Sequence, residues 1–249
     1  MEDWAEIQEK GCGRSVGKID RIVGRLMSQD AQISQTGPLA RIAWWKWGVA
    51  LVLLGLAGWY VSANAGRWKD RVVPRKFRVV DAGQIFASGQ IDRHLIRGVL
   101  ADNHINTIVA LVSDDPTDPD VREELQAVKE MGIQRFVDPL LGDGTGDIHE
   151  YANAVQQMVE ARKAGRVVLV HCSSGAQRTN GAVYFYRVLV EHANPDDAAR
   201  EMLRNGHDSH SNPALIPYLN SHIGEMAQLL KERGVIESVP DPLPQISVR

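Results

Sequence analysis

One short stretch of this chain combines residue types that together could bind and attack an anion. Residues 171–179 read HCSSGAQRT and follow an apolar run, VVLV. Cys172 is one of two cysteines in 249 residues, so we expect a free thiol and not half of a disulfide framework. Arg178 follows six positions later, and Thr179 comes next. This spacing places a nucleophile and a guanidinium at the two ends of one tight turn.

The surroundings of Cys172 predict an anion-binding loop. A buried strand that ends at His171 and leads directly into a helix leaves a turn at the carboxyl end of a sheet, where open α/β folds bind ligands. The backbone N–H groups of residues 173–178 can point inward around one anion, and the helix N-terminus adds its positive end. The predicted phosphate-binding loop consists of Ser173, Ser174, Gly175, Ala176, Gln177 and Arg178.

The side chains of this loop predict a nucleophile with supporting groups. The amide array and the helix end lower the pKa of a thiol, which favours a thiolate at Cys172. Arg178 offers a planar fork to two phosphate oxygens, and the Thr179 hydroxyl donates a hydrogen bond to the thiolate. His171 is expected to orient the loop through hydrogen bonds. A buried cysteine that only packs is the alternative interpretation of position 172.

These residues resemble the signature loop of the cysteine-dependent phosphatases, which is Cys, five residues, Arg and then Ser or Thr, preceded by His. The chain is similar to the dual-specificity branch, especially its bacterial tyrosine-phosphatase-like members, over about 77–203. Ala87, in the stretch FRVVDAGQIFASGQ, stands where relatives often have arginine, and Asn180 stands where they commonly have glycine. The resemblance implies hydrolysis through a phosphocysteine, with no metal and no other cofactor.

A proton donor for the leaving group is also required, and in the family it is an aspartate some thirty residues before the cysteine. The stretch VDPLLGDGTGD contains three candidates. Asp143 is preferred because two flanking glycines would let its loop swing over a bound phosphate. Asp147 is the second candidate, although it also suits a capping box at a helix start. Asp138 is the third, and it precedes a proline and suits a turn.

The substrate is predicted from what the loop lacks. It contains no lysine, whereas relatives that act on phosphoinositides or inositol polyphosphates often have lysines there. This favours phosphotyrosine, and then phosphoserine or phosphothreonine, on a protein partner. The alternatives are a lipid or small-molecule phosphatase, a non-catalytic phospho-binding module, a sulfur transferase and a membrane scaffold. His207 and His210 could suggest a metal site, but a polar loop between helices is the simpler interpretation, so no metal is predicted.

A second feature, an apolar segment, lies in the first third of the chain. Residues 47–66, WGVALVLLGLAGWYVSANAG, carry no charge, and a helix of this length spans about 30 Å, the thickness of a bilayer's hydrocarbon core. Five of the six tryptophans lie between Trp44 and Trp68, as expected for two interfacial belts. We expect one transmembrane helix, with a buried core helix as the alternative. The net charge of −3 gives no footprint for nucleic acid.

The orientation of this helix follows from its flanks. Lys and Arg crowd the C-terminal side, so the positive-inside rule favours a cytoplasmic location for the domain that follows. Ala63-Asn64-Ala65 also resembles a signal cleavage site, which would place that domain on the exported side instead. An uncleaved anchor is preferred. Cys12 would then lie across the membrane from Cys172.

The remaining pattern predicts an α/β domain with a central, mostly parallel sheet flanked by helices, preceded by the transmembrane helix. Strands are expected at 77–80, 84–88, 105–112, 133–140 and 166–171. Helices are expected at 91–104, 118–132, 148–165, 181–193, 195–206 and 214–234, and a short helix at 19–27 competes with a solvated tail. The expected divisions are a polar tail (1–41), the membrane helix (42–66), a basic linker (67–76), the phosphatase domain (77–235) and an irregular tail (236–249).

Overall fold

The structure is a computed structural model that describes residues 38–247. The chain divides into two units between Ala65 and Gly66, and each is described by itself. Cys12 and the predicted helix at 19–27 lie outside the described residues.

The first unit contains most of helix α2 (Pro38–Asp70), which is longer than the predicted span of 42–66. Its segment Lys46–Ala63 is long and apolar enough to cross a membrane, and none of that segment is buried. Large apolar side chains on it are more than half exposed, among them Leu51, Leu54 and Trp59. A soluble core helix would bury such side chains, so within the described residues the helix lacks the packing of a core helix.

The second unit is built on a five-stranded sheet in the order β1-β2-β5-β3-β4. Only β1 is antiparallel to its neighbour, so the predicted mostly parallel sheet is confirmed. The strands are β1 (Arg78–Asp81), β2 (Ile85–Gly89), β3 (Ile105–Ala110), β4 (Gln134–Val137) and β5 (Val167–Cys172).

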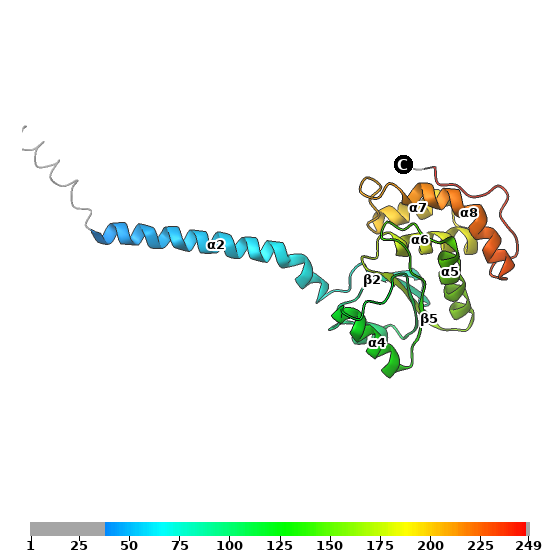
Figure 1. Ribbon diagram of the computed structural model, residues 1–249, viewed down its shortest axis with the longest axis horizontal. Helices are drawn as coiled ribbons and strands as arrows, with labels where there is room; N and C mark the ends of the chain where they lie inside the picture. Colours follow the sequence, from blue (N-terminus) through cyan, green and yellow to red (C-terminus); the bar gives the residue numbers. More distant parts are fainter. Residues whose placement is uncertain (1–37, 248–249) are drawn as a thin grey trace, which may run out of the picture. The chain divides into compact units, whose positions relative to one another are not determined.

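Helices cover both faces of this sheet, as Figure 1 shows. One face carries α3 (Ile96–Asp102) and α4 (Pro119–Met131), and the other carries α5 (Ile148–Lys163), α6 (Arg178–Phe185), the π-helix η1 (Tyr186–Val190), α7 (Pro195–Arg204) and α8 (Leu215–Glu232). The central strand β5 serves both layers. Val168 and Val170 face α5 and α6, whereas Leu169 faces the α3 and α4 layer, and all three are fully buried.

The ends of the helices follow local sequence signals. The Asp118 side chain caps α4 at its start, and Gly132 ends it with φ +67°. α3 begins five residues later than predicted, because the Asp92 carboxylate accepts from the His94 amide and forms a turn there. The predicted helix at 181–193 begins earlier, at Arg178, and its last turn is the π-helix.

Candidate active site

The signature loop, residues 172–178, joins β5 to α6 at the carboxyl edge of the sheet, between the ends of β2 and β3. Gly175 has φ +71°, a backbone conformation that favours glycine. A Cβ atom at this position would lie 2.5 Å from the Gly89 nitrogen and 2.7 Å from the Ser88 carbonyl carbon. The loop is therefore packed directly on the end of β2, and no side chain fits at position 175.

Cys172 lies at the bottom of this loop with 1% of its surface exposed. The Gly175 amide donates a hydrogen bond to its Sγ at 3.3 Å. Burial by itself raises the pKa of this thiol, but hydrogen bonds from the Thr179 hydroxyl and amide, the Arg178 charge and the Gly175 amide outweigh burial and lower the pKa of Cys172. Thr179 is fully buried, and its hydroxyl also lies 3.4 Å from the Ser88 carbonyl oxygen. These contacts favour the thiolate.

Arg178 is the first residue of α6, and its guanidinium lies across the loop. Nη2 donates to Ser173 Oγ at 2.9 Å. Nη1 donates to the carbonyl oxygens of Leu111 at 3.3 Å and Leu140 at 3.5 Å, which follow β3 and β4. Acceptors from three separate segments fix the plane of the guanidinium, so its remaining donors have a defined direction.

A buried ionic network lies beneath the cysteine. His171 Nε2 lies 3.3 Å from Glu124 Oε1, and both side chains are 1% exposed. Arg135 Nε donates to Glu124 Oε1 at 2.9 Å, and Gln90 Nε2 donates to Glu124 Oε2 at 2.8 Å. One carboxylate from α4 therefore connects the ends of β2 and β5 to β4. We call Gln90, Glu124, Arg135 and His171 the floor of the loop.

The floor is a charged cluster held inside the protein. Burial alone raises the pKa of Glu124, but the His171 and Arg135 charges and hydrogen bonds lower it to about 2. Burial alone lowers the pKa of His171, but the Glu124 carboxylate outweighs burial and raises it. The sequence analysis missed Glu124, although a signal existed. It shares the apolar stripe of α4 with the buried residues Val121 and Ala127, at a spacing of three.

Asp143 and Asp147, two of the three candidate aspartates, accept hydrogen bonds from backbone amides in the segment between β4 and the start of α5. Asp143 accepts from the Thr145 amide at 3.0 Å and from its hydroxyl at 2.8 Å, and these hydrogen bonds lower the pKa of Asp143. Asp147 is the N-cap of α5 and accepts from the His149 amide at 2.9 Å. Asp147 thus has the capping geometry that its position suggested, while Asp143 sits in a turn of its own.

Asp138 is held inside the domain. It is 3% exposed, and its Oδ1 accepts from Gln157 of α5 at 3.5 Å. Burial, followed by the charge of Glu150, raises the pKa of Asp138 to about 6. A raised pKa suits a proton donor, but the side chains that act on Asp138, including Asn153, all belong to α5.

The turn that contains Asp143 packs directly against the signature loop. Gly144 has φ +89°, and a Cβ atom there would lie 3.2 Å from the Gln177 carbonyl carbon. The hydroxyl of the fully buried Tyr151 donates to the Gly144 carbonyl at 2.6 Å. A Cβ atom at Gly181 of α6 would lie 2.3 Å from the same hydroxyl. Tyr151, which the sequence analysis did not single out, therefore connects the Asp143 turn to α6.

Several solved structures share the fold of this chain. TpbA from P. aeruginosa matches with a TM-score of 0.52 at 20% identity, covering 64% of this chain and 91% of that chain. A mutant form of Tk-PTP matches with a TM-score of 0.51 at 16% identity, covering 63% of this chain and 97% of that chain. The core catalytic domain of the PP-IP phosphatase SIW14 from S. cerevisiae matches with a TM-score of 0.51 at 17% identity. The match covers 69% of this chain and 97% of that chain. The chain has the fold of the cysteine-dependent tyrosine and dual-specificity phosphatases.

At sequence identities of 16–20%, these matches show a shared fold. No protein-family model matches the chain, and no curated protein matches it by sequence.

Ala87 and Asn180 stand where relatives often have arginine and glycine, and both are neighbours of Arg78. Arg78 on β1 is paired with Ala87 on β2, so both side chains lie on the same face of the sheet. Arg78 Nη2 donates to Asn180 Oδ1 at 2.6 Å, and Nη1 donates to the Gly175 carbonyl at 3.5 Å. Asn180 in turn donates to the Met202 carbonyl at 3.1 Å. An arginine from the neighbouring strand therefore contacts the signature loop, with Asn180 as its acceptor.

The polar loop that follows α7 also contacts the signature loop. His207 is 4% exposed, its Nδ1 lies 2.5 Å from Gln177 Oε1, and its Nε2 lies 3.1 Å from Ser209 Oγ. Burial lowers the pKa of His207. Both ring nitrogens thus have protein partners, while the His210 amide donates to Asp208. His207 thus holds the Gln177 side chain of the signature loop.

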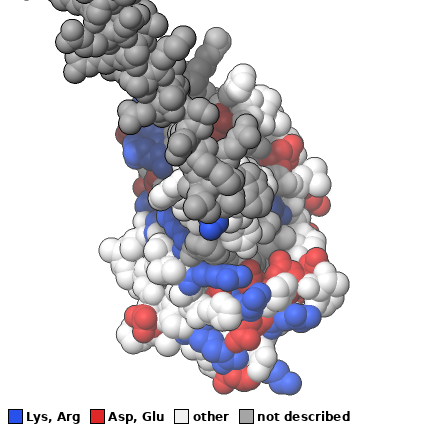
Figure 2. Space-filling model, turned by 90° about the vertical axis from the view of Figure 1, so that its left-hand side faces the viewer, with Lys and Arg blue, Asp and Glu red and all other residues white. Residues whose placement is uncertain are grey.

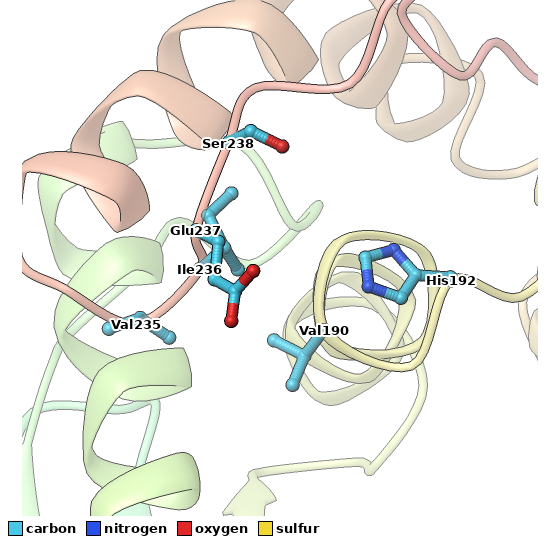
Figure 3. Close-up of a pocket in the computed structure, with 6 residues that line it drawn as sticks. All are labelled: Val190, His192, Val235, Ile236, Glu237 and Ser238. Carbon is cyan, nitrogen blue, oxygen red and sulfur yellow. The ribbon is translucent and has the colours of Figure 1, made fainter.

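A separate pocket lies between the end of η1 and the segment after α8, and Figure 3 shows the Glu237 carboxylate pointing into it. No residue of the signature loop or the floor lines this pocket. Its lining residues are Val190, His192, Val235, Ile236, Glu237 and Ser238.

Proposed function

We propose that this protein hydrolyses phosphomonoesters through a phosphocysteine intermediate. The observation that carries the proposal is the position of Cys172. Its thiol is buried beneath a loop of backbone amides, its pKa is lowered, and Arg178 is fixed beside it by three acceptors. A thiolate in an anion-binding loop attacks a bound phosphoryl group, and oriented donors stabilise the charge of the equatorial oxygens.

The first step transfers the phosphoryl group to the enzyme. The Cys172 thiolate attacks phosphorus in line, and the bond from phosphorus to the ester oxygen breaks as the new phosphorus–sulfur bond forms. The Asp143 carboxyl gives its proton to the departing oxygen, so the alcohol or phenol leaves neutral. The phosphocysteine remains in the loop, held by Arg178 and the amides of residues 173–178.

The second step returns the enzyme to its starting state. A water molecule attacks phosphorus and gives its proton to the Asp143 carboxylate, the phosphorus–sulfur bond breaks, and inorganic phosphate leaves. Cys172 is again a thiolate, and Thr179 stabilises it as the leaving group. Atoms and charges balance over the two steps, and the site needs no further reactant.

Asp143 is proposed as the proton donor because its turn packs against Gln177 of the loop. Its pKa is lowered in the free protein. A phosphate dianion bound next to it would raise that pKa, because a neighbouring negative charge disfavours ionisation. Asp147 and Asp138 are the alternatives. The first is engaged as a helix cap, and the second has side-chain contacts with α5.

The composition of the loop supports phosphotyrosine on a protein as substrate, since the loop itself contains no lysine. A cysteine-to-serine variant of TpbA, similar to this chain with a TM-score of 0.50 and 19% identity, has been solved in complex with pTyr. A phosphorylated polyol is the second candidate. SIW14 is named a PP-IP phosphatase, and cations lie beside the loop of this chain.

We also propose that the segment Lys46–Ala63 of α2 anchors the protein in a membrane, with the phosphatase domain on the cytoplasmic side. The support is the length, the apolar composition and the exposure of that segment, together with the Lys and Arg residues that follow it.

The test is turnover of an aryl phosphate by the full chain in detergent micelles, beside Cys172→Ser and the matched loop variant Ser174→Ala. We expect hydrolysis by the wild type and by Ser174→Ala, and none by Cys172→Ser. A folded wild type that binds phosphate without turnover would establish the phospho-binding module instead. Activity that persists in Cys172→Ser would exclude the phosphocysteine.

A further inference from the structure

A short basic segment enters the candidate active site from the N-terminal side. Arg75 lies between the end of α2 and the start of β1, Arg78 is the first residue of β1, and both contact the signature loop. Arg75 Nη1 donates to the Ser173 carbonyl at 3.5 Å, and Arg78 Nη1 donates to the Gly175 carbonyl at 3.5 Å. Lys76, which lies between them in sequence, is therefore also close to the loop.

Lys76 and Arg78 line a pocket together with the end of α7. The pocket has a volume of about 270 Å³, and a water molecule takes up about 30 Å³, so a hydrated phosphate group fits. A Cβ atom at Gly206 would lie 2.3 Å from Lys76 Nζ, so this glycine leaves room for the ammonium group. No carboxylate lines the pocket. Its lining residues are Lys76, Phe77, Arg78, Arg204, Asn205 and Gly206.

Two cations of this pocket, Lys76 and Arg204, have no carboxylate partner in the part of the chain that the structure describes. Neither Lys76 nor Arg204 forms an ion pair with a carboxylate of the described residues, whereas Arg75 is paired with Asp70. Burial, and then the charge of Arg78, lowers the pKa of Lys76. On the face drawn in Figure 2, Lys and Arg lie among Asp and Glu over much of the surface. A bound dianion would remove the repulsion among the pocket cations.

The position of α7 explains only part of this cluster. The C-terminal end of a helix carries partial negative charge and favours a cation such as Arg204. Lys76 and Arg78 belong to a different segment, and Arg78 is already oriented by Asn180. Lys76, Arg78 and Arg204 come from two segments and surround one cavity. The attraction of the helix end for a cation does not account for this arrangement, whereas a bound anion would.

We infer that this pocket binds a second phosphate group of the substrate whose first phosphate occupies the signature loop. The inference rests on the proposed phosphatase activity and, of its two candidate substrate classes, favours the phosphorylated polyol, as a headgroup that carries two or more phosphates. Basic residues directly after a membrane-spanning helix are typical of binding to phosphorylated lipid headgroups. Phe77 is the one apolar residue in the lining, so the pocket offers little to the side chains of a peptide. Lys76 would thus take the role that a lysine within the signature loop has in relatives that act on phosphoinositides.

The experiment compares inositol monophosphate with inositol bisphosphate as substrates of the full chain in detergent micelles. The variant is Lys76→Ala combined with Arg204→Ala. The matched control combines Arg122→Ala with Lys163→Ala, two exposed cations on α4 and α5 that line no part of the site. Arg78 is left unchanged because it supports the loop. Each headgroup is tested free and as a short-chain phosphatidyl lipid in the micelle.

In the wild type, we expect kcat/KM to be higher for the bisphosphate than for the monophosphate. We expect the pocket variant to lose this preference by about tenfold or more, since one charge-assisted contact contributes that much, while the control keeps it. A preference restricted to the phosphatidyl form identifies the lipid as the source of the headgroup, and a preference for both forms includes the free polyol.

Three results would overturn the inference while leaving the proposed function intact. The first is hydrolysis of an aryl phosphate with equal kcat/KM for inositol monophosphate and bisphosphate. The second is a preference for the bisphosphate that survives in the pocket variant. The third is a higher kcat/KM for a doubly than for a singly phosphorylated tyrosine peptide, with no such difference between the inositol phosphates. Absence of turnover on every substrate, including the aryl phosphate, would instead overturn the proposed function.

Discussion

The floor and the rim of the signature loop differ in how their charges are satisfied. In the floor, Glu124 and His171 are buried and paired with each other, and Arg135 completes the network. At the rim, which we define as Lys76, Arg204 and Asp143, the two cations have no ion pair among the described residues, and Asp143 bonds only within its own turn. Buried charges must be paired inside the protein, whereas unpaired charges beside a cavity are left for a ligand. Under the proposed function, the floor positions the loop and the rim selects what it binds.

The largest effect is expected in the signature loop itself, at Arg178. Arg178→Lys keeps the charge but loses the fork that bonds to three acceptors. We expect kcat/KM on an aryl phosphate to fall by about a thousandfold, which corresponds to about 4 kcal/mol, with little change in thermal stability. A loss of less than tenfold would mean that charge alone is sufficient.

The floor is tested by Glu124→Gln, which leaves His171 without its anion. Breaking a buried ion pair costs about 3 kcal/mol of unfolding free energy. The matched control is Glu123→Gln on the same helix, where the pair with Arg97 is partly exposed and its loss should cost much less unfolding free energy. Chemical denaturation of the two variants gives the comparison, and equal losses would contradict the distinction.

This penalty has a pH dependence with a defined sign. Glu124 has a lowered pKa, so its contribution is present above the unfolded value of 4.5 and is lost as the pH falls towards about 2. His171 has a raised pKa, so its contribution is present below 6.5 and is lost as the pH rises through the folded value. The destabilisation by Glu124→Gln should therefore be greatest between pH 4.5 and 6.5, and a penalty that grows below pH 4 would contradict the pairing.

The rim is tested at the proposed proton donor. Asp143→Asn should slow hydrolysis of an alkyl phosphate by about a hundredfold and slow that of a nitrophenyl phosphate much less, because a good leaving group needs no proton. Asp147→Asn is the control, since asparagine also caps a helix. Equal slowing of the two substrates by Asp143→Asn would transfer the role to Asp147 or Asp138, and the leaving-group dependence of their variants would decide between them.

The last effect is a gain in stability at Asp138. Its folded pKa of about 6 lies above the unfolded 3.8, so its carboxyl favours the fold below pH 3.8 and progressively less as the pH rises through 6. Asp138→Asn should therefore stabilise the protein at pH 8, by at most about 3 kcal/mol, and hardly at all at pH 4. Its amide could also donate to Gln157 Oε1, which lacks a hydrogen-bond partner in the structure. Denaturation at the two pH values checks this, and a gain at pH 4 equal to that at pH 8 would contradict it.

The fold and the signature loop could be predicted because their signals are local. The apolar run before His171, the glycine at 175 and the capping residues of the helices act within a few residues of themselves. All five predicted strands are present, and the alternation of strands and helices gave the parallel sheet. The start of α3 was misplaced because the Asp92 turn competes with the helix at its first residues.

The floor and the pocket could not be predicted because their residues are far apart in sequence. Glu124 meets His171 across forty-seven positions, and Lys76 meets Gly206 across one hundred and thirty. Only the order of the strands brings them together. The pairing of Arg78 with Ala87 likewise depends on the register of β1 against β2, which no local pattern specifies.

The contact between Gly175 and the end of β2 has a consequence for the timing of the reaction cycle. Because the loop is fixed on the strand when the protein folds, it is the same receptor for the ester, for the phosphorylated intermediate and for the phosphate that remains at the end. Free phosphate should then compete with the next substrate for the same amides. Under the proposed function, each turnover would therefore have to wait until inorganic phosphate leaves the loop.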